Sequence, residues 1–306
     1  MRTRRFCLVI WSGLIAGLLA MSVGEGWCSD RGREPASERV SQPKRSWLMV
    51  SLCTDGCSKG CRNVFSVMTK LSGNPHGKIL HFSQITPELI SEIQPEFVVL
   101  GPQGTPWCRY TGPKGVALQN FLWLLPVMAE EMNVPILWIC GGHQALALAF
   151  GGKVGPIRAG EFDCMPYNRD RQSGVVQITL MASDPLFQGA VGEVKLTESH
   201  YDEVKVLPPG FLLLASEKKS PNQIIRHGKL PVYGIQGHPE HFLSTRPDGG
   251  ILLKNFLDIA RDHNREFRSG QFSPPVVLAS AGSQRTTARK RNNWNRRDRY
   301  RYFRTP

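Results

Sequence analysis

Acidic residues are few in this sequence of 306 residues, since 25 Asp and Glu face 38 Lys and Arg and leave a formal net charge of +13. Much of the positive excess lies at residues 265–306, a stretch rich in Arg with Ser, Gly and Pro. Little in that stretch could bury a core, so we expect a disordered basic tail. Such a tail could contact nucleic acid or another anionic surface, although a solvated tail without a specific partner is favoured. The charge therefore says little about catalysis.

An internal repeat is also lacking, which excludes a solenoid or a propeller. At the N-terminus, MRTRR precedes a mainly apolar stretch from Phe6 to Val23, which is the pattern of a secretory signal peptide. The alternative is an uncleaved membrane anchor, because about 18 apolar residues just span a bilayer. We expect a signal peptide or anchor over residues 1–28, a polar linker over 29–45, and export to the periplasm or the cell exterior.

Paired cysteines of the zinc-knuckle kind are absent too. The motif C-x3-C-x3-C at Cys53, Cys57 and Cys61 has no second cluster, whereas zinc sites usually show C-x2-C pairs in two clusters. In an oxidising compartment we favour disulfides over a metal site. The cysteines concerned are Cys53, Cys57, Cys61, Cys108 and Cys164. Five cysteines cannot all pair with one another, so one stays free or joins Cys28.

What remains, residues 46–264, has the size of one α/β domain. Four short runs rich in Val, Ile and Leu do not alternate with polar residues, which is typical of strands buried on both faces of a parallel sheet. The runs are Trp47–Leu52, Lys78–Phe82, Phe97–Leu100 and Val134–Ile139. Helix-like stretches lie between them at Val64–Leu71, Pro87–Ile93 and Val116–Met132. This alternation predicts an α/β fold with a doubly wound, mostly parallel sheet.

The second half of the domain predicts a small antiparallel β extension, because its strands are short and joined by turns such as Pro208-Pro209-Gly210. The expected strands are Val175–Leu180, Glu193–Leu196, Phe211–Ala215, Gln223–His227 and Val232–Gln236. A final helix at Ile251–Arg261 is expected to pack back on the sheet.

The segment from Pro135 to Val154 holds a candidate nucleophile. A buried strand runs into Cys140, two glycines follow, and a helix begins near His143. A side chain at such a strand-to-helix turn is exposed at the carboxyl edge of the sheet, where open α/β sheets place their sites. The helix N-terminus lowers the pKa of a thiol and presents N–H groups to a developing oxyanion. A buried cysteine that simply ends a strand is the alternative.

A candidate base lies in the segment YGIQGHPEHF, where His238 and Glu240 are two residues apart. On an extended backbone, residues i and i+2 point to the same face, so we expect Glu240 to accept a hydrogen bond from His238. The other ring nitrogen would then face the thiol of Cys140. This is the arrangement of nucleophile, base and orienting carboxylate found in catalytic triads.

Three segments carry a family resemblance. ICGGHQALALAFGG is similar to the nucleophile segment of the class I glutamine amidotransferases, and YGIQGHPE resembles their G-V-Q-F-H-P-E. Between them, ESHYDEVKVLPPGFLLLAS resembles the S-H-x-D-x-V stretch of the glutaminase domain of GMP synthases. The resemblance implies a flavodoxin-like sheet and a reaction that needs neither metal nor cofactor, with glutamine or another γ-glutamyl amide as substrate.

Carried over residue by residue, the resemblance makes Cys140 the nucleophile, His238 the base and Glu240 the group that orients it. It implies an oxyanion hole formed by the N–H of Gly141 and a second donor in the loop from Leu100 to Pro106, for which Gly101 is preferred. The substrate-binding residues that it implies are Gln144, His200 and Asp202.

Two positions depart from the family pattern. A bulky residue usually follows the nucleophile, where Gly141 stands, and an aromatic one usually precedes the histidine, where Gly237 stands. We expect both glycines to widen the pocket or loosen its walls. No ATP-binding synthetase segment is present, so ammonia would be released or passed to a separate synthetase. The alternatives are a γ-glutamyl peptidase of the folate γ-glutamyl hydrolase type and a non-catalytic binding protein that retains the fold.

Overall fold

The computed structural model describes residues 45–157 and 170–268. The expected signal peptide or anchor, most of the expected linker, Cys164 and residues 269–306 of the expected basic tail lie outside this part. Within it, no helix combines the length and the apolar character that crossing a membrane requires.

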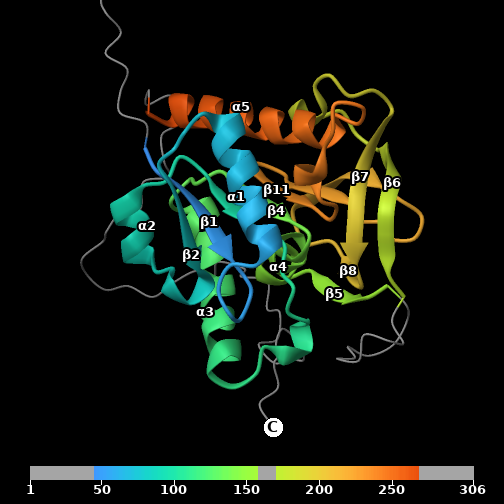
Figure 1. Ribbon diagram of the computed structural model, residues 1–306. Helices are drawn as coiled ribbons and strands as arrows, with labels where there is room; N and C mark the ends of the chain where they lie inside the picture. The colour runs from blue at the N-terminus through green and yellow to red at the C-terminus, as the bar shows by residue number, and fades with distance from the viewer. Residues whose placement is uncertain (1–44, 158–169, 269–306) are drawn as a thin grey trace, which may run out of the picture. The chain divides into compact units, whose positions relative to one another are not determined.

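A nine-stranded sheet forms the centre of the domain, in the order β2-β1-β3-β4-β11-β10-β9-β6-β7 (Figure 1). Its strands are β1 (Trp47–Ser51), β2 (Gly77–His81), β3 (Val98–Leu100), β4 (Ile136–Ile139), β6 (Gln172–Leu180), β7 (Glu193–His200), β9 (Phe211–Ser216), β10 (Ile224–His227) and β11 (Val232–Ile235). The strands from β2 to β11 in this order pair in parallel, and those from β11 to β7 pair antiparallel. The predicted parallel sheet with an antiparallel extension is confirmed.

Five helices lie among the described residues. They are α1 (Lys59–Ser72), α2 (Pro87–Ile93), α3 (Gly112–Glu130), α4 (Gly141–Ala149) and α5 (Asp248–Arg268). The side chain of Ser58 caps α1 by accepting from the amide of Cys61, and Thr86 caps α2 just before Pro87. The final helix continues to Arg268, past the expected end of the domain at residue 264.

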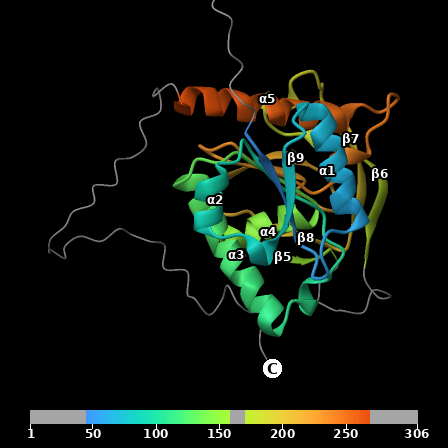
Figure 2. The same ribbon diagram turned by 60° about the vertical axis from the view of Figure 1, so that its left-hand side comes forward.

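Helices cover both faces of the parallel part of the sheet, as Figure 2 shows from the side. The side chains of Leu48 and Val50 belong to the core on the side of α2, α3 and α4. Those of Trp47 and Met49, which alternate with them on β1, belong to the core on the side of α1 and α5. Successive residues of a strand point to opposite faces, so every residue of β1 is buried, which explains its unbroken apolar run.

Two strands were not predicted. β5 (Lys153–Pro156) and β8 (Asp202–Val206) form a separate two-stranded antiparallel sheet. β5 contains Gly and Pro, which are rare in strands, and β8 follows β7 after the single residue Tyr201. β8 begins at Asp202, and Pro156 pairs with that residue. The small sheet therefore positions one of the expected substrate-binding residues.

The cysteine predictions are partly confirmed. Cys57 and Cys61 form a disulfide at the start of α1, and Cys108 is also disulfide-bonded. Cys53 is a free, buried thiol. The three cysteines of the C-x3-C-x3-C motif are thus a disulfide and one free residue.

Candidate active site

Cys140 lies at a sharp turn between β4 and α4. Its backbone has φ 54° and ψ −110°, a conformation that side-chain-bearing residues rarely adopt, and its side chain is buried. The amide of Cys140 donates to the carbonyl of Ile235 at 2.8 Å, which extends the pairing between β4 and β11 by one residue. A Cβ at Gly142 would lie 2.6 Å from the carbonyl oxygen of Leu100, so only glycine lets α4 begin this close to β3. This is the expected strand-to-helix turn.

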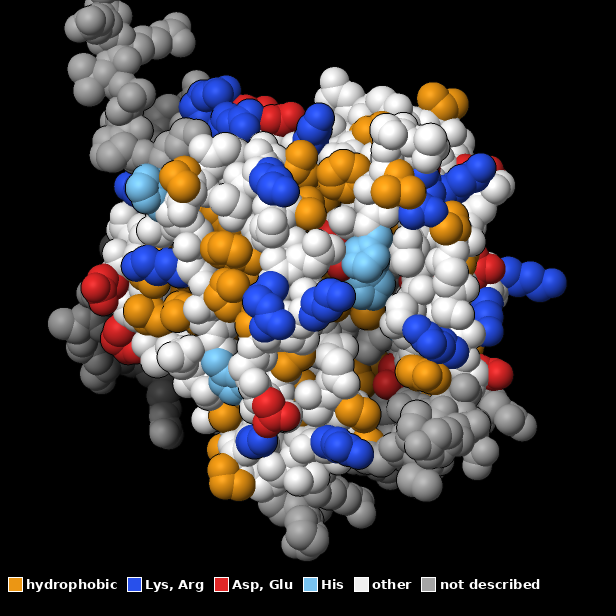
Figure 3. All heavy atoms as spheres, in the orientation of Figure 1, with side chains coloured by type: hydrophobic (Ala, Val, Ile, Leu, Met, Phe, Trp, Pro, Cys, Tyr) orange, Lys and Arg blue, Asp and Glu red, His pale blue; other side chains and the backbone are white. Residues whose placement is uncertain are grey.

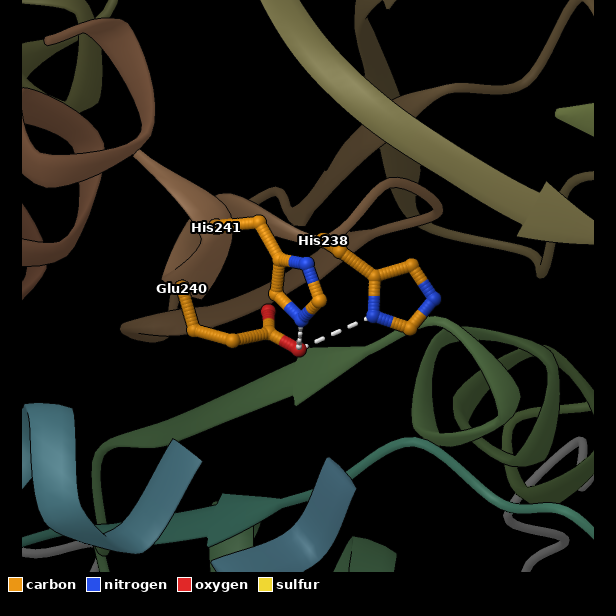
Figure 4. Close-up of side chains that lie close together, drawn as sticks. All are labelled: His238, Glu240 and His241. Atoms are coloured by element: carbon orange, nitrogen blue, oxygen red, sulfur yellow. Dashed lines mark hydrogen bonds and ion pairs between the residues drawn. The ribbon is translucent and has the colours of Figure 1, made fainter. Parts of the chain in front are cut away.

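His238 reaches the same edge because β11 is parallel to β4 and ends beside it. Nδ1 of His238 lies 2.9 Å from Oε1 of Glu240, as Figure 4 shows. The side chain of Glu240 is fully buried, and that of His238 is 12% exposed. The two residues that sequence analysis paired are therefore in hydrogen-bond contact.

The backbone that joins them differs from the prediction of an extended segment. Residues Pro239–His241 form a 3-10 turn, η5, rather than a continuation of β11. The amide of His238 donates to the carbonyl of Thr197 at 2.8 Å, so the chain is held to β7 as it turns. The partner in this cross-strand bond lies far away in sequence, and the local pattern does not reveal it.

Electrostatics favour a charged imidazole at His238. Burial alone lowers its pKa, but the charge of Cys140 and a hydrogen bond to that residue act in the opposite direction, as does the carboxylate of Glu240. The net effect raises the pKa of His238 well above its ordinary value. Among the described residues, Nε2 of His238 makes no hydrogen bond to a group other than the thiol. The geometry can support an imidazolium–thiolate pair.

The second expected oxyanion donor is wrong in its residue. The amide of Gly101 donates to the carbonyl of Val50 at 3.4 Å, and a Cβ at Gly101 would overlap the buried side chain of Met49. Gly101 thus still belongs to the sheet rather than to the site. Gln103 and Gly104, in the same loop, line the cavity next to Cys140 and Gly141.

This cavity has a volume of about 450 Å³ and contains all three expected substrate-binding residues among its lining. Gln144, however, has its amide occupied by the protein. Its Oε1 accepts from Nε1 of Trp107 at 2.7 Å, and its Nε2 donates to the carbonyl of Asp202 at 2.5 Å. The role of Gln144 in this structure is to tie α4 to the cavity wall.

His200 is similarly engaged. Its Nδ1 lies 2.9 Å from the carbonyl of Asp202, and its Nε2 lies 3.1 Å from Oε2 of Glu198. Both side chains of this ion pair are almost completely buried. Both ring nitrogens face acceptors, so either the imidazole carries two protons or the carboxyl group carries one.

Two residues near the site were missed by sequence analysis. Glu198 is the first, and Gln236, whose Nε2 lies 4.0 Å from Sγ of Cys140, is the second. Gln236 also accepts from Nε2 of Gln144 at 3.3 Å, so a buried polar network leads from α4 to the thiol. The unusual glycine at position 237 is the signal that could have pointed to Glu198.

The two glycines that depart from the family pattern do not loosen the walls. A Cβ at Gly141 would overlap the side chain of Gln103, whose Oε1 accepts from the hydroxyl of Tyr110 at 2.8 Å. A Cβ at Gly237 would lie 2.6 Å from Oε1 of Glu198. Side chains from other segments therefore fill both spaces, which corrects the expectation of a wider pocket.

Comparisons with known proteins agree with this arrangement. Residues 110–260 match the family model for glutamine amidotransferase class-I. The chain is 34% identical over 172 residues to the glutamine-hydrolyzing subunit of a GMP synthase from Thermococcus kodakarensis, and the match covers 56% of this chain and 79% of the relative. The corresponding subunit from Pyrococcus abyssi is 36% identical over 172 residues, with the same shares covered.

The fold is shared with a crystal structure of a protein from Thermoplasma acidophilum that is assigned to the same type of GMP synthase subunit. The TM-score is 0.57 at 24% sequence identity, and the match covers 74% of this chain and 98% of that chain. At this identity the likeness concerns the fold, whereas the sequence relatives carry the family assignment. The chain belongs to the class I glutamine amidotransferase family.

Proposed function

We propose that this chain hydrolyses the side-chain amide of glutamine, or of another γ-glutamyl amide, through a γ-glutamyl thioester on Cys140. The observation that carries the proposal is the convergence of Cys140, His238 and Glu240 at one sheet edge beside a cavity. Family membership supports the same reaction, because the relatives are named as glutamine-hydrolyzing.

The chemistry proceeds in two steps. The thiolate of Cys140 attacks the amide carbon, and the imidazolium of His238 gives its proton to the departing ammonia or amine. Water then attacks the thioester while His238, now neutral, accepts a proton from it, and the thiolate leaves as the carboxylate product forms. Glu240 accepts from Nδ1–H throughout and holds Nε2 toward the reacting atoms.

The oxyanion of each tetrahedral intermediate would accept from the amide of Gly141 at the start of α4. The second donor would come from Gln103 or Gly104, which line the cavity. Loss of one such donor typically raises the barrier by about 2.7–4 kcal/mol. Asp202, also in the lining, would bind the α-amino end of the substrate, with His200 behind it.

The ammonia released would either leave into solvent or pass to a separate synthetase. The relatives are named as one subunit of GMP synthase, which supports a separate partner. Export of the chain is a further part of the proposal, and the disulfide between Cys57 and Cys61 supports it because such bonds persist in oxidising compartments. The two parts point to different settings, and locating the mature chain in fractionated cells would distinguish them.

The test is to incubate the purified protein with glutamine and, separately, with a panel of γ-glutamyl amides, and to measure ammonia or amine release. We expect hydrolysis by the wild type and trapping of a thioester on Cys140 by mass spectrometry after acid quench. Cys140→Ser should show neither, with an unchanged free energy of unfolding. Release from γ-glutamyl peptides but not glutamine would indicate a peptidase, and no release or labelling would indicate a binding protein.

A further inference from the structure

His241 stands beside the pair formed by His238 and Glu240 and has no part in the proposed reaction. Its Nε2 lies 3.6 Å from Oε1 of Glu240, the same oxygen that contacts Nδ1 of His238 at 2.9 Å. Figure 4 shows both rings turned toward this carboxylate. One potential ligand atom from each of the three residues lies within 4.8 Å of the other two. The carboxylate therefore has two imidazoles beside it where the reaction requires one.

We propose that these three residues form a binding site for a divalent transition-metal ion, with zinc as the type case. The ligands would be Nδ1 of His238, Oε1 of Glu240 and Nε2 of His241. Bonds of about 2.0–2.2 Å from zinc to N and O place neighbouring tetrahedral ligands about 3.3–3.5 Å apart. The observed separations of 2.9 and 3.6 Å lie on either side of this value, so small side-chain rotations would complete the site.

A second observation also points to a ligand. Oε2 of Glu240 is buried and lacks a hydrogen-bond partner among the described residues, so this carboxylate has unused capacity to bind a cation. The side chain of His241 is 47% exposed, which leaves an entry path and room for water as a fourth ligand. The site is thus open on the side away from the thiol.

The nature of the ligands selects the class of metal. Two imidazoles and one carboxylate suit zinc, copper or nickel, whereas magnesium and calcium prefer sites made of oxygen alone. In Figure 3, histidine side chains reach the surface with Lys and Arg side chains close by. Positive charge nearby opposes any cation held by charge alone, so binding must depend on bonds to imidazole nitrogen.

Occupancy of this site would switch the enzyme off, an effect that rests on the proposed function. Metal binding at Nδ1 releases the proton on that nitrogen to solvent. The neutral ring then keeps its single proton on Nε2, so it can neither accept a proton there nor form an imidazolium beside the thiolate. The orienting carboxylate is occupied at the same time. The inhibition should be reversible by a chelator because no covalent bond to carbon forms.

Calorimetry with zinc chloride tests the site itself without any need for activity. Cys140→Ser is the starting protein, because it removes the thiol that could bind zinc directly. We expect Cys140→Ser to bind one zinc ion that Cys140→Ser/His241→Gln binds at least tenfold more weakly. Equal binding by the two proteins, or no binding by the first, would overturn the proposal.

Activity assays then test the consequence. Without added metal, His241→Gln should turn over substrate as fast as the wild type, but at least tenfold more zinc should be needed to inhibit it. Chelator should restore the wild type fully. Equal zinc sensitivity of the two proteins would show that zinc acts on the thiol and would overturn the regulatory role. If the wild type hydrolyses no amide, the proposed function fails, while the calorimetric result on the metal site still stands.

Discussion

The nucleophile and the base come from two halves of one sheet that differ in how they hold a residue in place. The half formed by β1 to β4 is apolar on both faces, and all residues of β4 are buried. The half that includes β6 to β11 also buries polar side chains, among them Gln172, Glu198, His200 and Gln223. The first half positions Cys140 by backbone geometry, and the second positions His238 by side-chain hydrogen bonds and ion pairs.

This difference has a physical consequence. A backbone turn held by packing and by strand pairing needs no particular polar partner, so it tolerates changes in the polar groups around it. A base held by polar contacts depends on each partner, because a buried polar group left alone is costly. Removing a partner in the second half should therefore affect catalysis or stability more than a comparable change in the first.

The largest expected effect is on turnover, in Glu240→Gln. The amide can no longer fix the imidazole tautomer by accepting reliably from Nδ1, so we expect kcat to fall about 10³–10⁴-fold. Steady-state ammonia release measures this, and circular dichroism should show an unchanged fold. His241→Gln alters the other neighbour of the same carboxylate and should leave kcat unchanged. A kcat for Glu240→Gln above a tenth of the wild-type value would contradict the role assigned to the second half.

The same contrast explains how much of the fold could be predicted from sequence. The four strands of the parallel half could be placed within a few residues because an unbroken apolar run such as Trp47–Ser51 signals burial on both faces. The nucleophile turn could be predicted because strand, Cys140 and two glycines are contiguous. These features are local, and local patterns carry them.

The polar half was harder because its contacts are non-local. The turn at Pro239–His241 depends on the bond from His238 to Thr197, and the pairing of Glu198 with His200 gains its meaning only from Gly237 across the sheet. Nothing adjacent in sequence encodes these contacts. Gly101 was also misassigned, because one residue of register decides whether an amide completes the β-ladder or faces the cavity.

The next largest effect should appear in a double-mutant cycle at the contact of Glu198 with Gly237. Glu198→Ala breaks a buried ion pair and should lower the free energy of unfolding by about 3–5 kcal/mol. Gly237→Phe should also destabilise, because its Cβ would lie 2.6 Å from Oε1 of Glu198. The double variant restores the aromatic that the family usually has there and gives it space, so it should be more stable than the sum of the two changes predicts.

Urea unfolding of the four proteins measures this coupling, which we expect to be about 0.5–3 kcal/mol in favour of the double variant. Gly104→Ala is a suitable control, because its Cβ would meet nothing within 4 Å. Additive effects of the two changes would mean that Glu198 and Gly237 are independent, and the polar half would then be less interdependent than its contacts indicate.

A smaller effect is expected from the disulfide of the apolar half. Cys57→Ser/Cys61→Ser opens a short loop, which should cost about 2 kcal/mol of unfolding free energy by loss of chain constraint. Because this half holds Cys140 by packing, kcat should change less than twofold. Chemical denaturation and the ammonia assay on the same samples decide the matter. A fall in kcat that matches the loss of stability would remove the distinction between the two halves.

The smallest effect, followed over a single pH unit, concerns His143, at the junction of the halves. Burial lowers the pKa of His143 to about 3, and the charge of His200 acts in the same direction against the hydrogen bond that joins Nε2 to the carbonyl of Asn222. The unfolded chain therefore binds a proton below about pH 6.5 that the native state excludes down to about pH 3. The free energy of unfolding should be unaffected by this residue above about pH 6.5. It should fall by about 1.4 kcal/mol per pH unit below that.

His143→Gln removes this titration while keeping a group that can donate to Asn222. Urea unfolding at pH 6 and pH 5 should show a pH-dependent loss of stability that is smaller in His143→Gln than in the wild type by about 1.4 kcal/mol. Equal losses would mean that the junction admits a proton or water at His143. The boundary between the apolar and the polar half would then lie on the other side of α4, with the nucleophile helix itself in the polar region.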